Sequence, residues 1–210
     1  MTEMVNIMLR RHGASLTAIV LATVAAMGCE ANNKSGQMET AAASRSTFVG
    51  RRAPEFALAN EHNQLVRLGD LRGRWVVLYF YPADDTPGCA CQATEFTHLL
   101  TTFRDLNATV LGVSGDSPAS HRRFIAKYDL GISLLSDPAH EAMSAYGAWV
   151  RTRMADQWLG RAIRSTVIVD PAGRVRYHWP EVIPQGHAAR VHAKLAELQS
   201  AANQPCGCGS

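Results

Sequence analysis

The stretch Trp75-Val-Val-Leu-Tyr-Phe80 is a continuous apolar run that ends at Tyr81-Pro82. Short runs of this kind, rich in β-branched and aromatic residues, are typical of strands that are buried on both faces of a sheet. Two similar runs follow along the chain, Thr109-Val-Leu-Gly-Val-Ser114 and Thr166-Val-Ile-Val-Asp170. We therefore expect three central strands of a sheet with both faces covered.

Helical patterns separate these runs. Between the first two, apolar residues recur at helical spacing, at Phe96, Leu99, Leu100 and Phe103. Ser117-Pro118 has the pattern of a helix start, and a last helix is expected near residues 186–200. The turn sequence at residues 170–173 predicts an antiparallel hairpin of residues 164–169 and 174–178. The alternation predicts an α/β fold with a central mixed sheet flanked by helices.

The composition is that of an ordinary globular protein. The 210 residues are 47% hydrophobic and 19% charged, enough for one domain with a sizeable core plus appendages. The formal net charge is +3, and the basic residues are dispersed, so we expect no nucleic-acid partner. The eight histidines show no metal-ligand spacing, and we expect neither a metal nor another cofactor. Five cysteines are too few for a disulfide scaffold, which suggests a chemical role for them.

The N-terminal residues 1–29 have the pattern of an export signal. Arg10 and Arg11 precede a short uncharged apolar segment that is followed by small residues and Cys29. The surrounding Ala26-Met27-Gly28-Cys29 resembles a bacterial lipoprotein cleavage box, in which the cysteine is lipidated. The alternative is a plain secretory signal that is cut nearby, with Cys29 incidental. Either way we expect export to the bacterial cell envelope, with a lipid anchor in the membrane as the favoured form.

The rest of the chain divides into three segments. Residues 30–47 are polar and without periodicity, as expected for a flexible linker. Residues 48–202 form the predicted domain, and residues 203–210 form a mobile tail that contains Cys206 and Cys208.

The most informative stretch is Tyr79-Phe-Tyr-Pro-Ala-Asp-Asp-Thr-Pro-Gly-Cys89, which leads from a buried strand through a turn to a helix start. Unpaired backbone N–H groups at a helix start favour negative charge, and the thiolate is the nucleophilic form of cysteine. Thr86 can direct its hydroxyl toward the same point, and Pro82 can shield the sulfur from water. This turn favours nucleophilic attack by Cys89 on a weak bond.

The same stretch, Pro82-x-x-x-Thr86-x-x-Cys89, resembles the active-site loop of peroxiredoxins, and the bacterioferritin comigratory protein subgroup is the most similar. The resemblance extends from about Phe48 to Leu198. It is supported by the segments Ala53–Leu58, Asp70–Gly73, Val113–Ser117, Ser120-His121, Leu134–Asp137, Tyr146-Gly147, Arg164–Thr166 and Gly186-His187.

The resemblance implies a thioredoxin-like fold and a thiol-dependent peroxidase without metal or flavin. Hydrogen peroxide or an organic hydroperoxide would oxidise Cys89 to a sulfenic acid. Arg164, which matches the family's active-site arginine, would stabilise the thiolate and hold the peroxide together with Thr86. Arg161 is close enough in sequence to be confused with it. A thioredoxin-like protein or a small thiol would be the reductant, and the chain would be a monomer or a homodimer.

The usual resolving cysteine of the subgroup, five residues after the first, is replaced by Thr94. Three candidates are left besides an external thiol: Cys206 and Cys208 of the tail, and Cys91. Residues two apart on a helix do not face each other, so Cys91 is the least favoured. A rival hypothesis is a thioredoxin-like copper chaperone that uses Cys89 with Cys91, or the tail pair. A disulfide oxidoreductase is disfavoured, because Cys89-Ala-Cys91 lacks the two-residue gap of the redox motif.

Overall fold

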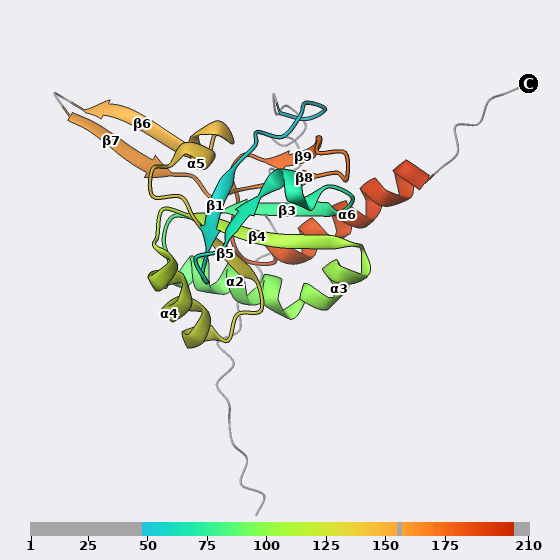
Figure 1. Ribbon diagram of the computed structural model, residues 1–210, viewed down its shortest axis with the longest axis horizontal. Helices are drawn as coiled ribbons and strands as arrows, with labels where there is room; N and C mark the ends of the chain where they lie inside the picture. The colour runs from blue at the N-terminus through green and yellow to red at the C-terminus, as the bar shows by residue number, and fades with distance from the viewer. Residues whose placement is uncertain (1–47, 155–156, 204–210) are drawn as a thin grey trace, which may run out of the picture.

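The computed structural model describes residues 48–154 and 157–203. Within these residues a seven-stranded sheet, flanking helices and a separate two-stranded hairpin are formed (Figure 1). The elements, in chain order, are β1 (Ala57–Asn60), β2 (Leu65–Arg67), η1 (Leu68–Leu71), β3 (Trp75–Phe80), α2 (Pro87–His98), α3 (Leu100–Asp105), β4 (Ala108–Ser114), α4 (Pro118–Tyr128), β5 (Ser133–Ser136), α5 (Glu141–Ala145), β6 (Trp149–Met154), β7 (Gln157–Ala162), β8 (Ser165–Val169), β9 (Val175–Trp179) and α6 (His187–Asn203).

The sheet has the strand order β2-β1-β5-β4-β3-β8-β9. Strand β3 pairs in parallel with β4 and antiparallel with β8, so that Val77 lies between Val110 and Ile168. β4 also pairs in parallel with β5, whereas β8 and β9 form an antiparallel hairpin. All six residues of β3 are buried. The expected mixed sheet, its three central strands and the hairpin near Asp170 are confirmed.

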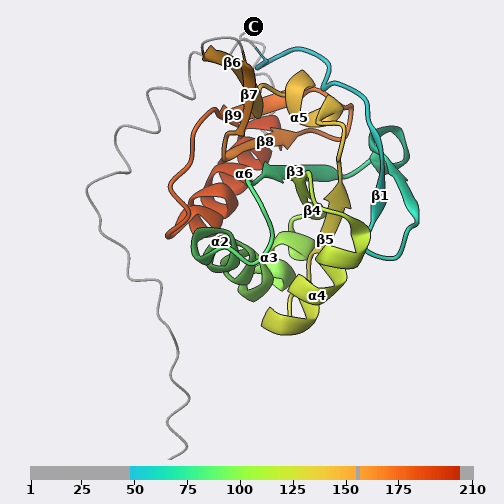
Figure 2. The same ribbon diagram turned by 90° about the vertical axis from the view of Figure 1, so that its left-hand side faces the viewer.

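Alternate residues of β3 face two separate cores. Val77 and Tyr79 face one core, to which α2, α3, α4 and α6 contribute. Leu78 and Phe80 face the other, which is closed by η1 and α5 (Figure 2). The helices therefore cover both faces of the sheet, as buried parallel strands require. The loop that leaves the C-terminal end of β3 runs directly into α2, and it is this connection that positions Cys89.

The predicted helices are present with altered boundaries. The apolar spacing from Phe96 to Phe103 is divided at Leu99, where α2 ends and α3 begins. Helix α4 begins at Pro118, and the Ser117 hydroxyl caps it by accepting a hydrogen bond from the backbone N–H of Ser120 at 3.3 Å. The last helix, α6, begins one residue after Gly186 and runs to residue 203.

The predicted export signal (1–29), with Cys29, and the predicted linker (30–47) lie outside the described residues, as do Cys206 and Cys208 of the predicted tail. Among the helices of residues 48–154 and 157–203, none has the length and apolar character that a membrane crossing needs.

Candidate active site

Cys89 is the third residue of α2 and is only 1% exposed. Pro87 occupies the first turn, where its missing N–H costs nothing, and Thr86 precedes the helix in an extended conformation. The first intrahelical hydrogen bond is donated by the N–H of Ala90 to the carbonyl of Thr86. The N–H groups of Gly88 and Cys89 therefore precede the helical ladder and are oriented toward the helix start, where negative charge is stabilised.

The loop before the helix is fixed by Asp84. Its carboxylate accepts a hydrogen bond from the Tyr81 hydroxyl at 2.7 Å and lies 3.0 Å from Nδ1 of His121, which is fully buried on α4. Its backbone N–H donates to the Asp116 carboxylate at 2.8 Å. Burial raises the pKa of Asp84, but the hydrogen bonds from His121 and Tyr81 outweigh it, so the net pKa is lowered. The loop is thus held to α4 by the ionised Asp84 carboxylate and to the segment after β4 by the Asp84 backbone N–H.

The Arg164 side chain bridges Cys89 and Gln92, one turn apart on α2. Its Nη2 donates to Cys89 Sγ at 3.1 Å, and its Nη1 donates to Gln92 Oε1 at 2.7 Å. The residue immediately precedes β8, and its carbonyl accepts a hydrogen bond from the N–H of Val182. Arg161, by contrast, lies exposed on β7. The structure therefore brings Arg164, and not Arg161, to the cysteine.

Gln92 is a site residue that sequence reasoning missed. It is fully buried and holds one arm of the Arg164 guanidinium, while its Nε2 has no hydrogen-bond partner among the described residues. The one available signal is its spacing, because a residue three positions after Cys89 lies on the same side of the helix. Its amide fixes the direction of the arginine fork.

Thr86 and Pro82 lie on the loop as predicted, but the Thr86 hydroxyl has a different partner. Its Oγ1 donates to the Ala83 carbonyl at 3.3 Å, and Pro82 is exposed at the turn. Gly88 is closely packed: a Cβ there would lie 3.3 Å from the Pro184 ring and 3.5 Å from Arg164 Nη2. The catalytic roles of Thr86 and Pro82 stay predictions.

Two further titratable groups near the site, Tyr79 and His187, are buried. Tyr79 is buried, and burial, followed by the negative charges of Cys89 and Asp84, raises its pKa well above the usual value. His187 contacts the Thr166 hydroxyl through Nε2 at 2.9 Å, and burial, followed by nearby arginines, lowers its pKa well below the usual value. Both groups are therefore neutral near neutral pH. His187 is the first residue of α6.

Cys91 is separate from Cys89. Its side chain is half-buried, with Sγ 3.9 Å from Glu95 Oε1, and it is engaged in a disulfide. Cys89 is a free thiol, so the partner of Cys91 is a different cysteine. In residues 48–154 and 157–203 no group of three or more His, Cys, Asp or Glu side chains comes together in a way that could hold a metal ion.

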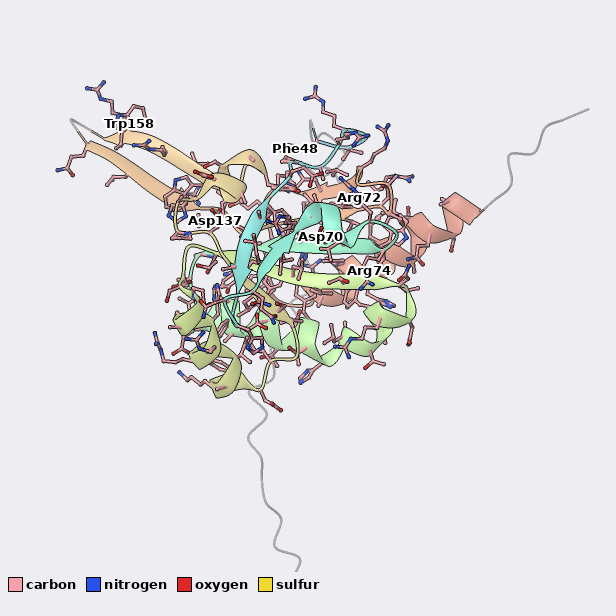
Figure 3. All side chains as sticks on the ribbon, in the orientation of Figure 1. Phe48, Asp70, Arg72, Arg74, Asp137 and Trp158 are labelled. Carbon is pink, nitrogen blue, oxygen red and sulfur yellow. The ribbon has the colours of Figure 1, made fainter. Side chains whose placement is uncertain are left out.

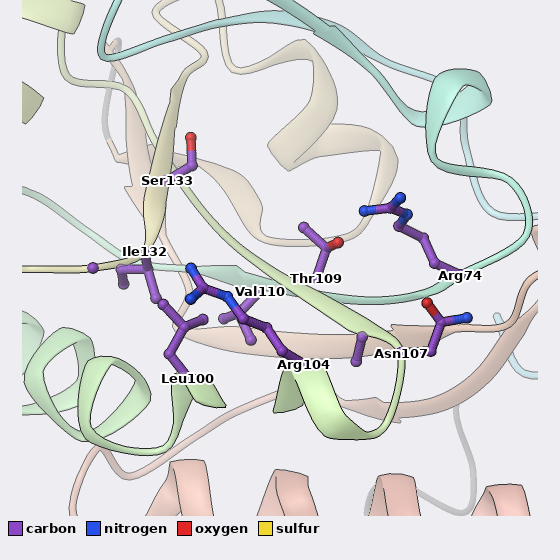
Figure 4. Close-up of a pocket in the computed structure, with 10 residues that line it drawn as sticks. Arg74, Leu100, Arg104, Asn107, Thr109, Val110, Ile132 and Ser133 are labelled. Carbon is purple, nitrogen blue, oxygen red and sulfur yellow. The ribbon is translucent and has the colours of Figure 1, made fainter. Parts of the chain in front are cut away.

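A cavity of about 420 Å³ lies where β4 and β5 begin (Figure 4). Arg74, Arg104 and Asn107 border it, and Leu100 and Ile132 form part of its apolar lining. Cys89 follows the opposite end of the parallel strands, so this cavity is separate from the site.

Comparison with known proteins agrees with the geometry. Residues 49–178 match the model of the AhpC/TSA family. The chain is 34% identical over 151 residues to peroxiredoxin Bcp of Bacillus subtilis, covering 71% of this chain and 96% of that protein. The chain belongs to the AhpC/TSA family, as a peroxiredoxin.

Solved structures of peroxiredoxins share the fold. The bacterioferritin comigratory protein of Xanthomonas campestris is 34% identical, with a TM-score of 0.65 and coverage of 68% of this chain and 91% of that one. A mutant of PrxQ from Xylella fastidiosa is 36% identical, with a TM-score of 0.63 and coverage of 70% and 90%. The thioredoxin-like fold and the thiol-dependent peroxidase expected from the sequence are confirmed. The alternatives of a copper chaperone and of a thiol-disulfide oxidoreductase find no support in these comparisons.

Proposed function

We propose that Cys89 is the thiol through which this peroxidase reduces its substrate, with Arg164 as the group that holds the thiolate and the peroxide. The observation that carries the proposal is the 3.1 Å contact between Arg164 Nη2 and Cys89 Sγ at the start of α2. A guanidinium is charged at every relevant pH and offers several donors in one plane. It can therefore face the sulfur and an incoming peroxide oxygen together.

The reaction begins when the Cys89 thiolate attacks one peroxide oxygen. An S–O bond forms, the O–O bond breaks, and the second oxygen leaves as hydroxide or alkoxide and takes up a proton. The sulfur is oxidised by two electrons to a sulfenic acid, and the peroxide is reduced to water or an alcohol. Arg164 and the Cys89 N–H supply donors to the developing charges, and Thr86 would add a third once its hydroxyl turns away from the Ala83 carbonyl. Each such preorganised donor contributes about 3 kcal/mol to the transition state.

Both hydrogen peroxide and organic hydroperoxides are proposed as substrates. The Xanthomonas campestris relative is described by its alkyl peroxide reduction activity. A thioredoxin-like protein or a small thiol is the proposed reductant, acting on a monomer or homodimer. Export to the cell envelope and lipidation at Cys29 are also proposed, on the sequence pattern alone.

The sulfenic acid is then resolved by a second thiol, which forms a disulfide with Cys89 and releases water. Cys206, Cys208, Cys91 and an external thiol are the candidates. Non-reducing peptide mapping of the fully reduced chain after one equivalent of hydrogen peroxide distinguishes them. A peptide that links Cys89 to a tail cysteine identifies an internal route, whereas Cys89 found only as a mixed disulfide with added thiol identifies an external one.

The role of Cys89 is tested by trapping. The reduced chain is exposed to peroxide with a dimedone-type probe that reacts with sulfenic acids. We expect one label per chain, lost in Cys89→Ser and retained in Cys91→Ser, the matched control on the same helix. Labelling that persists in Cys89→Ser would place the reacting sulfur elsewhere.

A further inference from the structure

The cavity where β4 and β5 begin lies at the far end of the sheet from Cys89. Figure 3 shows Arg74, which precedes β3, and Asp137, which follows β5, at opposite ends of the strands. Because β3, β4 and β5 are parallel, the loop to Cys89 leaves the sheet at the same end as Asp137. The cavity has a volume of about 420 Å³, which is within the range of pockets for small organic ligands.

Two arginines from separate elements face this cavity. Arg74 comes from the loop before β3 and Arg104 from the last turn of α3, and both side chains extend toward the cavity in Figure 4. Both are exposed, and neither guanidinium forms a hydrogen bond or ion pair with another described residue. The hydroxyl of Thr109, which also lines the cavity, has no partner in that part of the chain either. Unpaired N–H donors of this kind are suited to an anion.

The two arginines are held on one frame by Asn107. Its Nδ2 donates to the Gly73 carbonyl at 3.1 Å, and its carbonyl accepts a hydrogen bond from the N–H of Trp75 at 3.0 Å, so both neighbours of Arg74 are fixed to the turn after α3. The N–H of Asn107 donates to the Arg104 carbonyl at 2.9 Å. The backbone that carries both guanidinium groups is therefore formed in advance, which lowers the entropic cost of binding a ligand between them.

The deeper lining of the cavity is apolar. Val110 and Ile132 are buried residues of the core, and Leu100 packs against that core. Gly131 adds no side chain, and a Cβ there would lie 3.2 Å from Leu100. A ligand that contacts the arginines would therefore also cover apolar surface.

Acidic residues near the cavity determine where a negative charge fits. Glu61 Oε2 accepts a hydrogen bond from the Ser133 hydroxyl at 2.9 Å, so a carboxylate already lies beside the Ser133 edge. Asp70 and Asp105 are exposed and close in sequence to the arginines, but neither forms an ion pair with them. An anionic group is therefore expected at the arginines and away from the Ser133 edge.

We propose that this cavity binds an amphipathic organic anion, a carboxylate on a short alkyl chain. The carboxylate would accept hydrogen bonds from Arg74 and Arg104, whose planar forks match its two oxygens. The chain would cover Leu100 and Ile132. An inorganic anion is a poorer occupant because it leaves this apolar surface in contact with water, and a neutral chain gains nothing from the arginines. The ligand would not compete with the peroxide, because Cys89 is at the other end of the sheet.

Heteronuclear NMR of the isotope-labelled full chain tests the location, with sodium octanoate as the probe. We expect saturable shifts of the backbone amides of Thr109, Gly131 and Ile132, whereas the amide of Cys89 should not move. Sodium acetate, which lacks the chain, and octanol, which lacks the charge, should each bind about tenfold more weakly or worse.

Matched variants separate the two arginines from general charge effects. Arg74→Gln with Arg104→Gln should raise the octanoate dissociation constant, measured by calorimetry, about tenfold, because an exposed ion pair contributes up to about fivefold. Arg51→Gln with Arg67→Gln removes two exposed charges outside the cavity and should leave the constant unchanged. All four side chains are exposed, so both double variants should fold.

Three results would overturn the proposal. The first is octanoate that shifts no amide around the cavity, whether or not it binds elsewhere. The second is an equal octanoate affinity in the two double variants. The third is acetate or octanol that binds as tightly as octanoate, which would make the cavity a site for a simple anion or for a neutral chain.

Discussion

Arg164 donates from Nη2 to Cys89 Sγ at 3.1 Å and from Nη1 to Gln92 Oε1 at 2.7 Å. Replacing it by glutamine removes the charged donor to the sulfur, and the shorter side chain does not extend as far toward Gln92. Loss of one preorganised donor at developing charge costs about 3–4 kcal/mol in the transition state, or roughly 100- to 1000-fold in rate. We expect the second-order rate constant for oxidation of Cys89 by hydrogen peroxide to fall by that factor. Arg164→Lys should be intermediate, because an ammonium keeps the charge but not the fork.

The assay is stopped-flow oxidation of the reduced chain under single-turnover conditions, with sulfenic acid trapping as the second readout. Arg161→Gln is the control, because it removes the same charge three residues earlier from an exposed site on β7. Circular dichroism of each variant checks that the fold is intact. A folded Arg164→Gln chain that reacts within threefold of the original, at the same rate as Arg161→Gln, would refute the role given to this guanidinium.

Three further predictions concern the surroundings of the site and the core. Gln92→Leu should slow peroxide reduction at least about tenfold by releasing Arg164, because a hydrogen bond to a charged group contributes about 1.5–3 kcal/mol. Gln92→Glu, which keeps an acceptor for the guanidinium, should restore the rate. Unchanged single-turnover rates in Gln92→Leu would refute this role of Gln92. Gly112→Ala places a Cβ 2.6 Å from the buried Tyr79 side chain and should lower the free energy of unfolding, measured by urea titration, by about 1–3 kcal/mol. Gly69→Ala, whose Cβ would have no atom nearer than 3.9 Å, should change it little. Equal effects of the two substitutions would contradict the packing argument. Burial lowers the pKa of His178 from 6.5 to about 4, so between these pH values the unfolded chain binds a proton that the folded chain does not. The free energy of unfolding should therefore fall by up to about 3 kcal/mol as the pH drops from about 6.5 to about 4. His178→Asn should show a shallower decline, and an identical pH dependence in this variant would show that His178 is not the group responsible.

The central strands could be predicted because burial on both faces gives continuous apolar runs, as in β3. Strands β1, β2 and β5 are only three or four residues long, which is too short for a periodic signal. The β6–β7 hairpin was missed for a different reason. Every residue of β7 except Ala162 is exposed, so the strand has no alternation between a buried and a solvent face.

The site was predicted in part. The loop to Cys89 is local in sequence and could be recognised there, and Arg164 lies where the resemblance places it. Gln92 could not be found in the same way, because its hydrogen bond joins residues 72 positions apart. The partner of the Thr86 hydroxyl depends on a side-chain rotamer, which residue spacing does not determine.

In the proposed cycle, the enclosure of Cys89, with 1% of its surface accessible, separates the oxidation of the sulfur from its regeneration. A molecule of a few atoms can diffuse to this sulfur, but a protein thiol cannot form a disulfide with it until the first turn of α2 unwinds. Regeneration by a protein thiol therefore requires that turn to open. At high peroxide concentration a second oxidant molecule arrives before the opening does, so the same enclosure sets the dose at which the enzyme is lost to sulfinic acid.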